Sequence, residues 1–295
     1  MCIERWVINM KQIFLYFISF IITITSFITD ASESSILQHK IILSNTRGIP
    51  FSIGDGDYAI WGFEVDDDEN FWFLGGDFAT LVKMTKKGEV LLRREYSEFK
   101  ANPIGIREQN LYVFDYVFDR GINRDPHGKL FVISCDNGKI LKDFPILFKN
   151  RLNWHGFLDN GIIFELSFAK PPYDIKDMFK YFLYSYDGKY IGEVSNESGL
   201  NEPYNFLKFD YYIGKYKNNP LFAKYCMEND QWEIFTIDIR GQITQKTIID
   251  HKILGEPFSE APKDLWCLSN NKLFMVYRKG ESAIITELDL NKLMK

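Results

Sequence analysis

Three acidic residues, Glu64, Glu108 and Asp264, lie near predicted inner strands of a β-structure and have the oxygen ligands that divalent cations prefer. His155, which follows Trp154 in another such strand, can act as a general acid, a general base or a metal ligand. A histidine that makes a structural hydrogen bond would have the same sequence context, so that interpretation stays open. We therefore predict no cofactor, with a divalent metal ion bound by Glu64, Glu108 and Asp264 as the alternative.

A second group of candidate residues lies in two long predicted loops, residues 117–128 and 169–178, and at the start of the predicted inner strand that begins at Trp154. Loops that are held by a rigid scaffold commonly carry binding residues. We expect a protein, a peptide or a glycan to bind there. The candidate binding residues are Asp119, Arg120, Arg124, His127, Trp154, His155 and Tyr173.

Motifs that identify an enzyme are missing from the sequence. It has no glycine-rich phosphate loop, no G-x-S-x-G, no H-E-x-x-H and no C-x-x-C. Its formal net charge is −5 with both signs interspersed, so no basic stripe is present to bind nucleic acid. Cys135, Cys226 and Cys267 lack a metal-binding spacing, and we interpret them as small buried hydrophobic residues. These features favour a non-catalytic protein over an enzyme.

The dominant pattern is an internal repeat of about 50 residues. Four segments combine a strand, a tight glycine turn and a second strand, and a fifth has asparagine at the turn position. The turn residues are separated by 50, 50, 53 and 50 positions. Glycine, or asparagine as the next choice, fits a hairpin position that needs a positive φ. The turn residues are Gly88, Gly138, Gly188, Gly241 and Asn291.

Two further strand candidates precede each turn, which gives four antiparallel strands per repeat. This pattern predicts an all-β fold, a β-propeller, as a single domain over residues 36–295. We expect five blades, with six as the alternative. Only four residues follow Asn291, too few for a good outer strand. We therefore expect the strand at residues 38–44 to complete the last blade and close the ring, which would remove an exposed sheet edge.

Blade geometry assigns the turns to two faces. The turns between the first and second strands share one face with the glycine hairpins, whereas the long loops share the other. The acidic run 66–69 resembles a set of calcium ligands. Because it lies in a predicted short turn, we interpret it as a solvated surface turn.

Residues 68–91 carry a resemblance to known families. The segments Asp68-Glu-Asn-Phe-Trp-Phe-Leu and Leu81-Val-Lys-Met-Thr-Lys-Lys-Gly88-Glu-Val-Leu look like a blade of the NHL-repeat and TolB-like propellers. The resemblance covers most of residues 58–291 and transfers no catalytic residues. Those relatives usually have six blades. A metal ion in the channel would resemble the lactonase-type propellers, although an asparagine-rich ligand pattern is missing here.

The first 31 residues differ from the rest. No residue from Gln12 to Thr29 is charged, Lys11 precedes this run, and Thr29 and Ala31 are small residues at a potential cleavage site. These features predict a signal peptide that is removed on export. An uncleaved membrane anchor at residues 12–29 is the alternative, and it would be the only contact with a membrane.

Together these patterns predict an exported, non-catalytic β-propeller, located in the periplasm, at the cell surface or outside the cell. Its partner would be a protein, a peptide or a glycan bound at the face of the long loops. The alternative is a metal-dependent, lactonase-like or carbohydrate-active enzyme whose site lies in the central channel.

Overall fold

The computed structural model describes residues 37–44, 60–75, 79–100, 104–117, 127–147, 151–158, 160–168, 181–194, 211–226, 228–238, 242–250, 266–279 and 282–294. Residues 39–295 form one compact unit. Among the described residues, no helix is long and apolar enough to cross a membrane.

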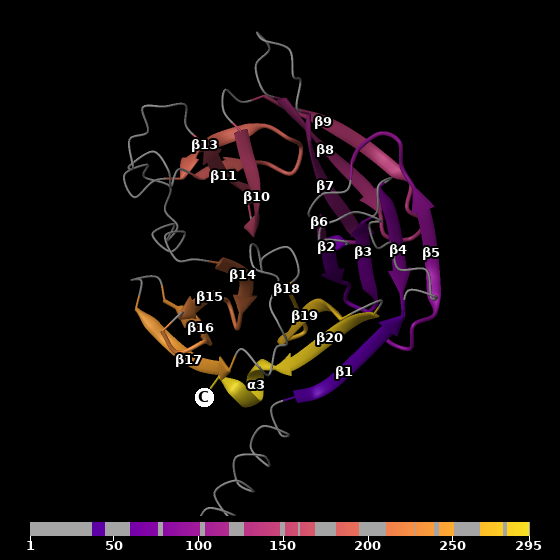
Figure 1. The fold of residues 1–295 in the computed structure, drawn as a ribbon. Helices are drawn as coiled ribbons and strands as arrows, with labels where there is room; N and C mark the ends of the chain where they lie inside the picture. Colours follow the sequence, from indigo (N-terminus) through magenta and orange to yellow (C-terminus); the bar gives the residue numbers. More distant parts are fainter. Residues whose placement is uncertain are drawn as a thin grey trace, which may run out of the picture. The chain divides into compact units, whose positions relative to one another are not determined.

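The described strands form five four-stranded antiparallel sheets, which we number as blades in chain order. Blades 1 to 3 follow the chain directly (Figure 1). Blade 1 contains β2 (Ile60–Val65), β3 (Phe71–Gly75), β4 (Thr80–Met84) and β5 (Val90–Glu95). Blade 2 contains β6 (Ile104–Arg107), β7 (Asn110–Val117), β8 (His127–Ser134) and β9 (Ile140–Leu147). Blade 3 contains β10 (Arg151–Leu158), β11 (Gly161–Phe168), β12 (Tyr181–Tyr184) and β13 (Tyr190–Val194).

Blade 4 repeats this order and blade 5 departs from it. Blade 4 contains β14 (Tyr211–Tyr216), β15 (Asn219–Cys226), β16 (Gln231–Ile237) and β17 (Ile243–Asp250). Blade 5 contains β18 (Trp266–Ser269), β19 (Lys272–Lys279), β20 (Ser282–Asp289) and β1 (Leu37–Ser44), in the sheet order β1-β20-β19-β18. Closure of the ring through the N-terminal strand stays a prediction.

The glycine hairpins take the conformation that the repeat predicts. Gly88, Gly138 and Gly188 have φ values of 82°, 67° and 79°, and each lies between the third and fourth strands of its blade. Gly241 lies outside the described residues. The prediction for Asn291 is wrong, because this residue lies in the short helix α3 (Leu290–Leu293). The carboxylate of Asp289 accepts a hydrogen bond from the Asn291 N–H and caps this helix, so the chain winds into a helical turn after β20.

Apolar side chains on both faces of each sheet explain why the blades stack. Phe71 and Phe73 of β3 pack against blade 5, where the Phe71 ring lies 6.1 Å from that of Phe274. Trp72 and Leu74, which alternate with them, pack against blade 2. All four β3 side chains are buried. This two-sided burial is what radial packing of blades requires.

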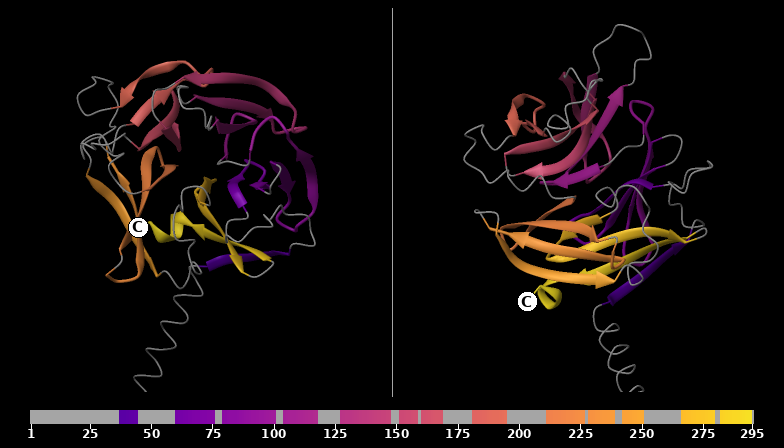
Figure 2. Two further views of the ribbon diagram at one scale, coloured as in Figure 1. Left: turned by 45° about the horizontal axis from the view of Figure 1, so that its top comes forward. Right: turned by 60° about the vertical axis from the view of Figure 1, so that its left-hand side comes forward.

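The first strand of each blade lies innermost, and the five sheets surround a common centre (Figures 1 and 2). The five innermost strands are β2, β6, β10, β14 and β18. The fold is therefore a five-bladed β-propeller, as the repeat predicts.

Candidate functional site

One position in the innermost strands carries functional groups in only two of the blades. In each blade a residue at the end of the first strand pairs across a turn with a residue at the start of the second strand, and in blade 1 this pair lies one residue beyond the strands. The position in question lies two residues before the first-strand member of that pair. In blades 2, 3 and 4 this position is glycine: Gly105, Gly156 and Gly214. In blade 5 it is Cys267, and in blade 1 it is Glu64. The two non-glycine residues therefore lie in neighbouring blades.

The surroundings of this position confirm the equivalence. A Cβ atom at Gly156 would lie 3.2 Å from the ring of Tyr212 in the next blade, and one at Gly214 would lie 3.4 Å from Leu268 in the next blade. Cys267 likewise faces the next blade, where Val65 donates its backbone N–H to the sulfur at 3.3 Å. At Gly156, Gly214 and Cys267 this position is thus directed toward the innermost strand of the following blade.

Glu64 and Cys267 form a hydrogen-bonded pair between blades 1 and 5. The Cys267 thiol donates to Oε2 of Glu64 at 2.8 Å. Burial raises the pKa of the Glu64 carboxyl to about 7, because desolvation outweighs the hydrogen bonds from Cys267 and Val65. The pKa of Cys267 is also raised, first by burial and then by the nearby Glu64 charge. Glu64 can therefore exchange a proton near neutral pH, whereas Cys267 stays a thiol and is a poor nucleophile.

Glu64→Gln is expected to change how stability depends on pH. The folded-state pKa of about 7 lies above the ordinary value of 4.5, so the folded protein holds this proton more tightly than the unfolded chain. The stability that this proton contributes is present at low pH and is lost as the pH rises from about 4.5 to about 7. At pH 8 the variant should exceed the wild type by about 3 kcal/mol in free energy of unfolding, with little difference at pH 4.

Urea denaturation from pH 4 to pH 8 measures this difference. Glu108→Gln is the matched control, because Glu108 is an exposed glutamate in the turn between β6 and β7. A constant difference for Glu64→Gln across the same range would contradict the raised pKa.

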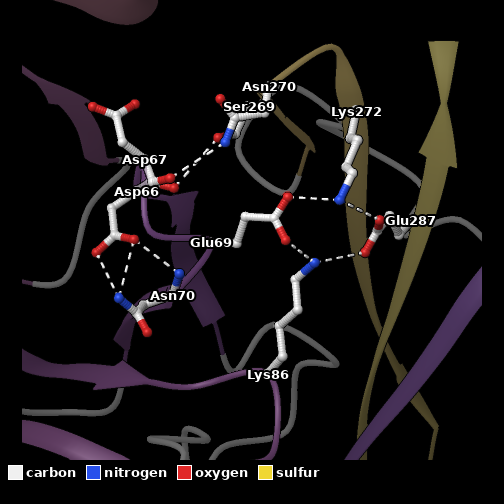
Figure 3. A network of polar contacts seen from close by, with 9 residues as sticks. All are labelled: Asp66, Asp67, Glu69, Asn70, Lys86, Ser269, Asn270, Lys272 and Glu287. Carbon is white, nitrogen blue, oxygen red and sulfur yellow. Dashed lines mark hydrogen bonds and ion pairs between the residues drawn. The ribbon is translucent and has the colours of Figure 1, made fainter. Parts of the chain in front are cut away.

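A four-residue ion-pair network, which we name the clasp, joins blades 1 and 5 at the face of the short turns (Figure 3). It consists of Glu69, Lys86, Lys272 and Glu287. Glu69 pairs with Lys86 and, at 2.6 Å, with Lys272. Glu287 pairs with the same lysines at 3.0 Å and 2.9 Å. Each carboxylate therefore contacts both ammonium groups, and the two lysines lower the pKa of Glu69.

The turn that supplies Glu69 also contains the buried carboxylate of Asp66. This carboxylate accepts hydrogen bonds from Asn70 and from the indole N–H of Trp72, and it pairs with Lys83 at 3.0 Å. Burial alone would raise the pKa of Asp66, but these contacts outweigh it and lower the pKa. The backbone carbonyl of Asp66 also accepts a hydrogen bond from the Ser269 hydroxyl of blade 5.

The interpretation of residues 66–69 as a solvated turn is therefore only half right. Asp67 and Asp68 are exposed, but Asp66 and Glu69 are held by hydrogen bonds and ion pairs. The partners of Glu69 in blade 5 are about 200 residues away in sequence, so no local pattern indicated them.

The other candidates from the sequence fall into two groups. Trp154 and His155 lie on innermost strand β10, where the ladder pairs Trp154 with Phe164 and has a bulge between Trp154 and Gly156. His127 is the first residue of β8. The remaining binding and metal candidates lie outside the described residues: Asp119, Arg120, Arg124, Tyr173 and Asp264.

The metal-ligand hypothesis lacks a complete ligand set within the described part of the chain. Glu64 is hydrogen-bonded to Cys267, and Glu108 has an exposed side chain near the Arg107 guanidinium. No group of three or more His, Cys, Asp or Glu side chains among the described residues is placed to hold a metal ion. A site that includes Asp264 stays a prediction.

The long connections leave the blades at one face. The connections at 118–126 and 169–180 follow the second strands of blades 2 and 3, and those at 195–210 and 251–265 follow the fourth strands of blades 3 and 4. In an antiparallel sheet the second and fourth strands run in the same direction, so their C-terminal ends lie at the same face of the propeller. At the opposite face, turns of two residues join the first and second strands of blades 2 to 5.

Five radial sheets with these connections define the chain as a β-propeller. No protein-family model matches it, and no curated protein matches its sequence.

Solved structures resemble the chain only distantly. A protein of unknown function from Bacteroides caccae has 15% identity, with 65% of this chain and 64% of that chain covered, at a TM-score of 0.34. The β-propeller domain of the Trilobed protease from Pyrococcus furiosus has 13% identity, with 79% and 67% covered, at 0.34. Virginiamycin B lyase from Staphylococcus aureus has 17% identity, with 85% and 74% covered, at 0.34. The chain spans less than two thirds of the Bacteroides caccae protein.

Proposed function

We propose that this chain is a binding propeller that takes a protein, a peptide or a glycan at the face of the long connections. The observation that carries the proposal is the asymmetry between the two faces. Four long connections, at 118–126, 169–180, 195–210 and 251–265, join strands at one face, whereas short turns join them at the other. A rigid scaffold that carries long connections at one face is a common design for binding proteins.

The short-turn face is suited to stability rather than to binding. The clasp, the Asp66 contacts and a hydrogen bond from Arg107 of blade 2 to the Leu158 carbonyl of blade 3, at 2.6 Å, all use its polar groups to join blades. Because these groups bind one another, they are not available to a ligand. The candidate residues Asp119, Arg120 and Arg124 belong to the connection between β7 and β8, and the ends of these two strands lie at the opposite face.

Two finer points belong to the same proposal. The uncharged run at residues 12–29 supports export through a signal peptide, with a membrane anchor as the alternative. The blade pattern of residues 68–91 supports kinship with the NHL-repeat and TolB-like propellers.

The test compares binding by the full chain with binding by a charge-reversed variant. An array of defined glycans and a displayed library of random peptides serve as probes. The variant combines Asp119→Lys, Arg120→Glu and Arg124→Glu. We expect the wild type to select ligands from one probe set and the variant to bind them at least tenfold more weakly, which corresponds to about 1.4 kcal/mol.

A second variant controls for the change in charge. Asp136→Lys with Lys139→Glu reverses exposed charges in the hairpin turn of blade 2, at the opposite face. This variant should bind like the wild type. Equal binding by all three proteins, or loss of binding in the control alone, would place the site elsewhere.

An enzyme with its site in the central channel is the second candidate function, and the Glu64 carboxyl is the observation that favours it. A pKa of about 7 suits a general acid or base near neutral pH. Elemental analysis of the purified chain, together with a panel of lactones and oligosaccharides as substrates, tests this function. Turnover that is lost in Glu64→Gln would support it, and no turnover on the whole panel would count against it.

A further inference from the structure

The outermost strands of blades 1 to 4 each have one edge that no described strand pairs with, and three of them carry features that discourage pairing. β5 ends in the charged residues Arg93, Arg94 and Glu95. β9 contains Pro145, which cannot donate a backbone hydrogen bond. β13 has only five residues. Charge, proline and short length are the usual protections of a sheet edge against other chains.

β17 is neither short nor interrupted by proline, and its two charged residues, Lys246 and Asp250, are of opposite sign. It has eight residues, no proline and five β-branched residues in the sequence ITQKTIID. Ile243 and Ile248 are 53% and 52% exposed. The ladder with β16 has a register shift between Ile243 and Gln245 and is regular from Gln245 to Asp250. An edge strand with exposed β-branched residues readily adds another strand.

On one face of β17 a basic, an apolar and an acidic side chain follow one another. This order is complementary to the same strand run in the opposite direction. Ile248 is paired with Glu233 in the ladder, Lys246 with Phe235, and Asp250 with Gln231, so the three β17 residues share one face. If two β17 strands run antiparallel with Ile248 opposite itself, Lys246 of one copy lies opposite Asp250 of the other. This register gives an apolar pair at the two-fold axis and an oppositely charged pair on each side, which are stabilising cross-strand pairs.

We propose that a second copy of this chain docks antiparallel on β17, so that two blades 4 form one continuous eight-stranded sheet across a two-fold axis. The interface is isologous, because the same strand serves both copies. The Lys246 ammonium, which also pairs with Glu233 at 2.6 Å within its own chain, remains partly exposed and bridges both carboxylates. The proposal does not depend on the proposed function, since β17 lies at the rim of the ring.

Light scattering on the full chain, separated by size, tests this proposal. We expect a mass of twice 34.7 kDa for the wild type. Ile248→Lys places two like charges at the axis and should give the monomer. Leu141→Lys is the matched control, because Leu141 is 56% exposed on outer strand β9, and it should stay dimeric. Circular dichroism checks that each variant keeps its β-structure.

A charge exchange tests the register. Lys246→Glu places two acidic residues opposite each other and should weaken the dimer at least tenfold. Adding Asp250→Lys restores opposite charges across the axis but not the ion pair with Glu233, so recovery of the dimer supports this register. A wild type that stays monomeric at about 100 µM would overturn the proposal, since a specific dimer forms at this concentration. Dissociation of Leu141→Lys, or no recovery on charge exchange, would overturn it as well.

Discussion

Glu287→Ala is expected to lower the free energy of unfolding by about 3 kcal/mol. The Glu287 side chain is only 1% exposed and pairs with Lys86 and Lys272, whose side chains are 29% and 27% exposed. Removing this carboxylate leaves two ammonium groups that share Glu69 alone. Breaking a buried ion pair on one side costs more than the pair contributes, because the remaining charge loses its partner. Urea denaturation followed by circular dichroism measures the loss.

Two further variants distinguish the stability that the ion pairs contribute from the effect that any substitution could have. Glu95→Ala removes a glutamate whose side chain is 64% exposed, and it should change the free energy of unfolding by less than about 0.5 kcal/mol. Lys86→Met, Lys272→Met and Glu69→Gln together in the Glu287→Ala background remove every charge of the clasp and should recover part of the loss. If Glu287→Ala costs no more than Glu95→Ala, the clasp does not hold blades 1 and 5 together.

Trp72→Ala is expected to cost about 4 kcal/mol, the largest effect among these substitutions. Trp72 is fully buried between blades 1 and 2, its indole N–H donates to Asp66 at 3.0 Å, and the Lys83 ammonium lies 4.9 Å from its ring centroid. The substitution opens a large cavity and also removes a hydrogen bond from a buried carboxylate. Guanidinium denaturation at pH 7 measures the change.

Trp72→Phe separates the free-energy cost of the cavity from the cost of the lost hydrogen bond. Phenylalanine fills most of the volume but has no N–H group, so the expected cost is about 1 to 2 kcal/mol. Because Asp66 loses one of its donors in this variant, its pKa should rise toward the ordinary value. The additional stability loss should then appear at neutral pH and shrink as the medium is acidified. Equal losses for Trp72→Phe and Trp72→Ala would contradict the division between cavity and hydrogen bond.

The sequence predicts those parts of the fold that local chemistry determines. Gly88, Gly138 and Gly188 could be identified because a positive φ in a tight hairpin excludes most other residues. The same argument predicted a hairpin turn at Asn291, which was wrong. Asparagine also fits a helical turn, and here Asp289 caps the helix that contains it. The count of five blades follows from the spacing of the turns.

The candidate site was harder to predict, because its groups come from opposite ends of the chain. Glu64 was identified as a carboxylate near the centre, but its partner Cys267 looked like an ordinary buried residue of a strand. The signal that could have found the pair is an alignment of the repeats, which places Gly105, Gly156 and Gly214 at the position of both residues. The role of the acidic turn at Glu69 required knowledge of which blades become neighbours.

The contacts between blades 1 and 5 have a consequence for how the chain acquires its structure. Four hydrogen bonds there, including those from Cys267 to Glu64 and from Lys272 to Glu69, join residues 203 positions apart. Contacts of such long range form late, after the local hairpins. At ordinary translation rates, blade 5 is synthesised roughly ten to forty seconds after blade 1. During this time the face of blade 1 that carries Phe71 and Phe73 lacks the blade against which it packs. A chain interrupted before residue 266 would leave this surface bare and prone to aggregate.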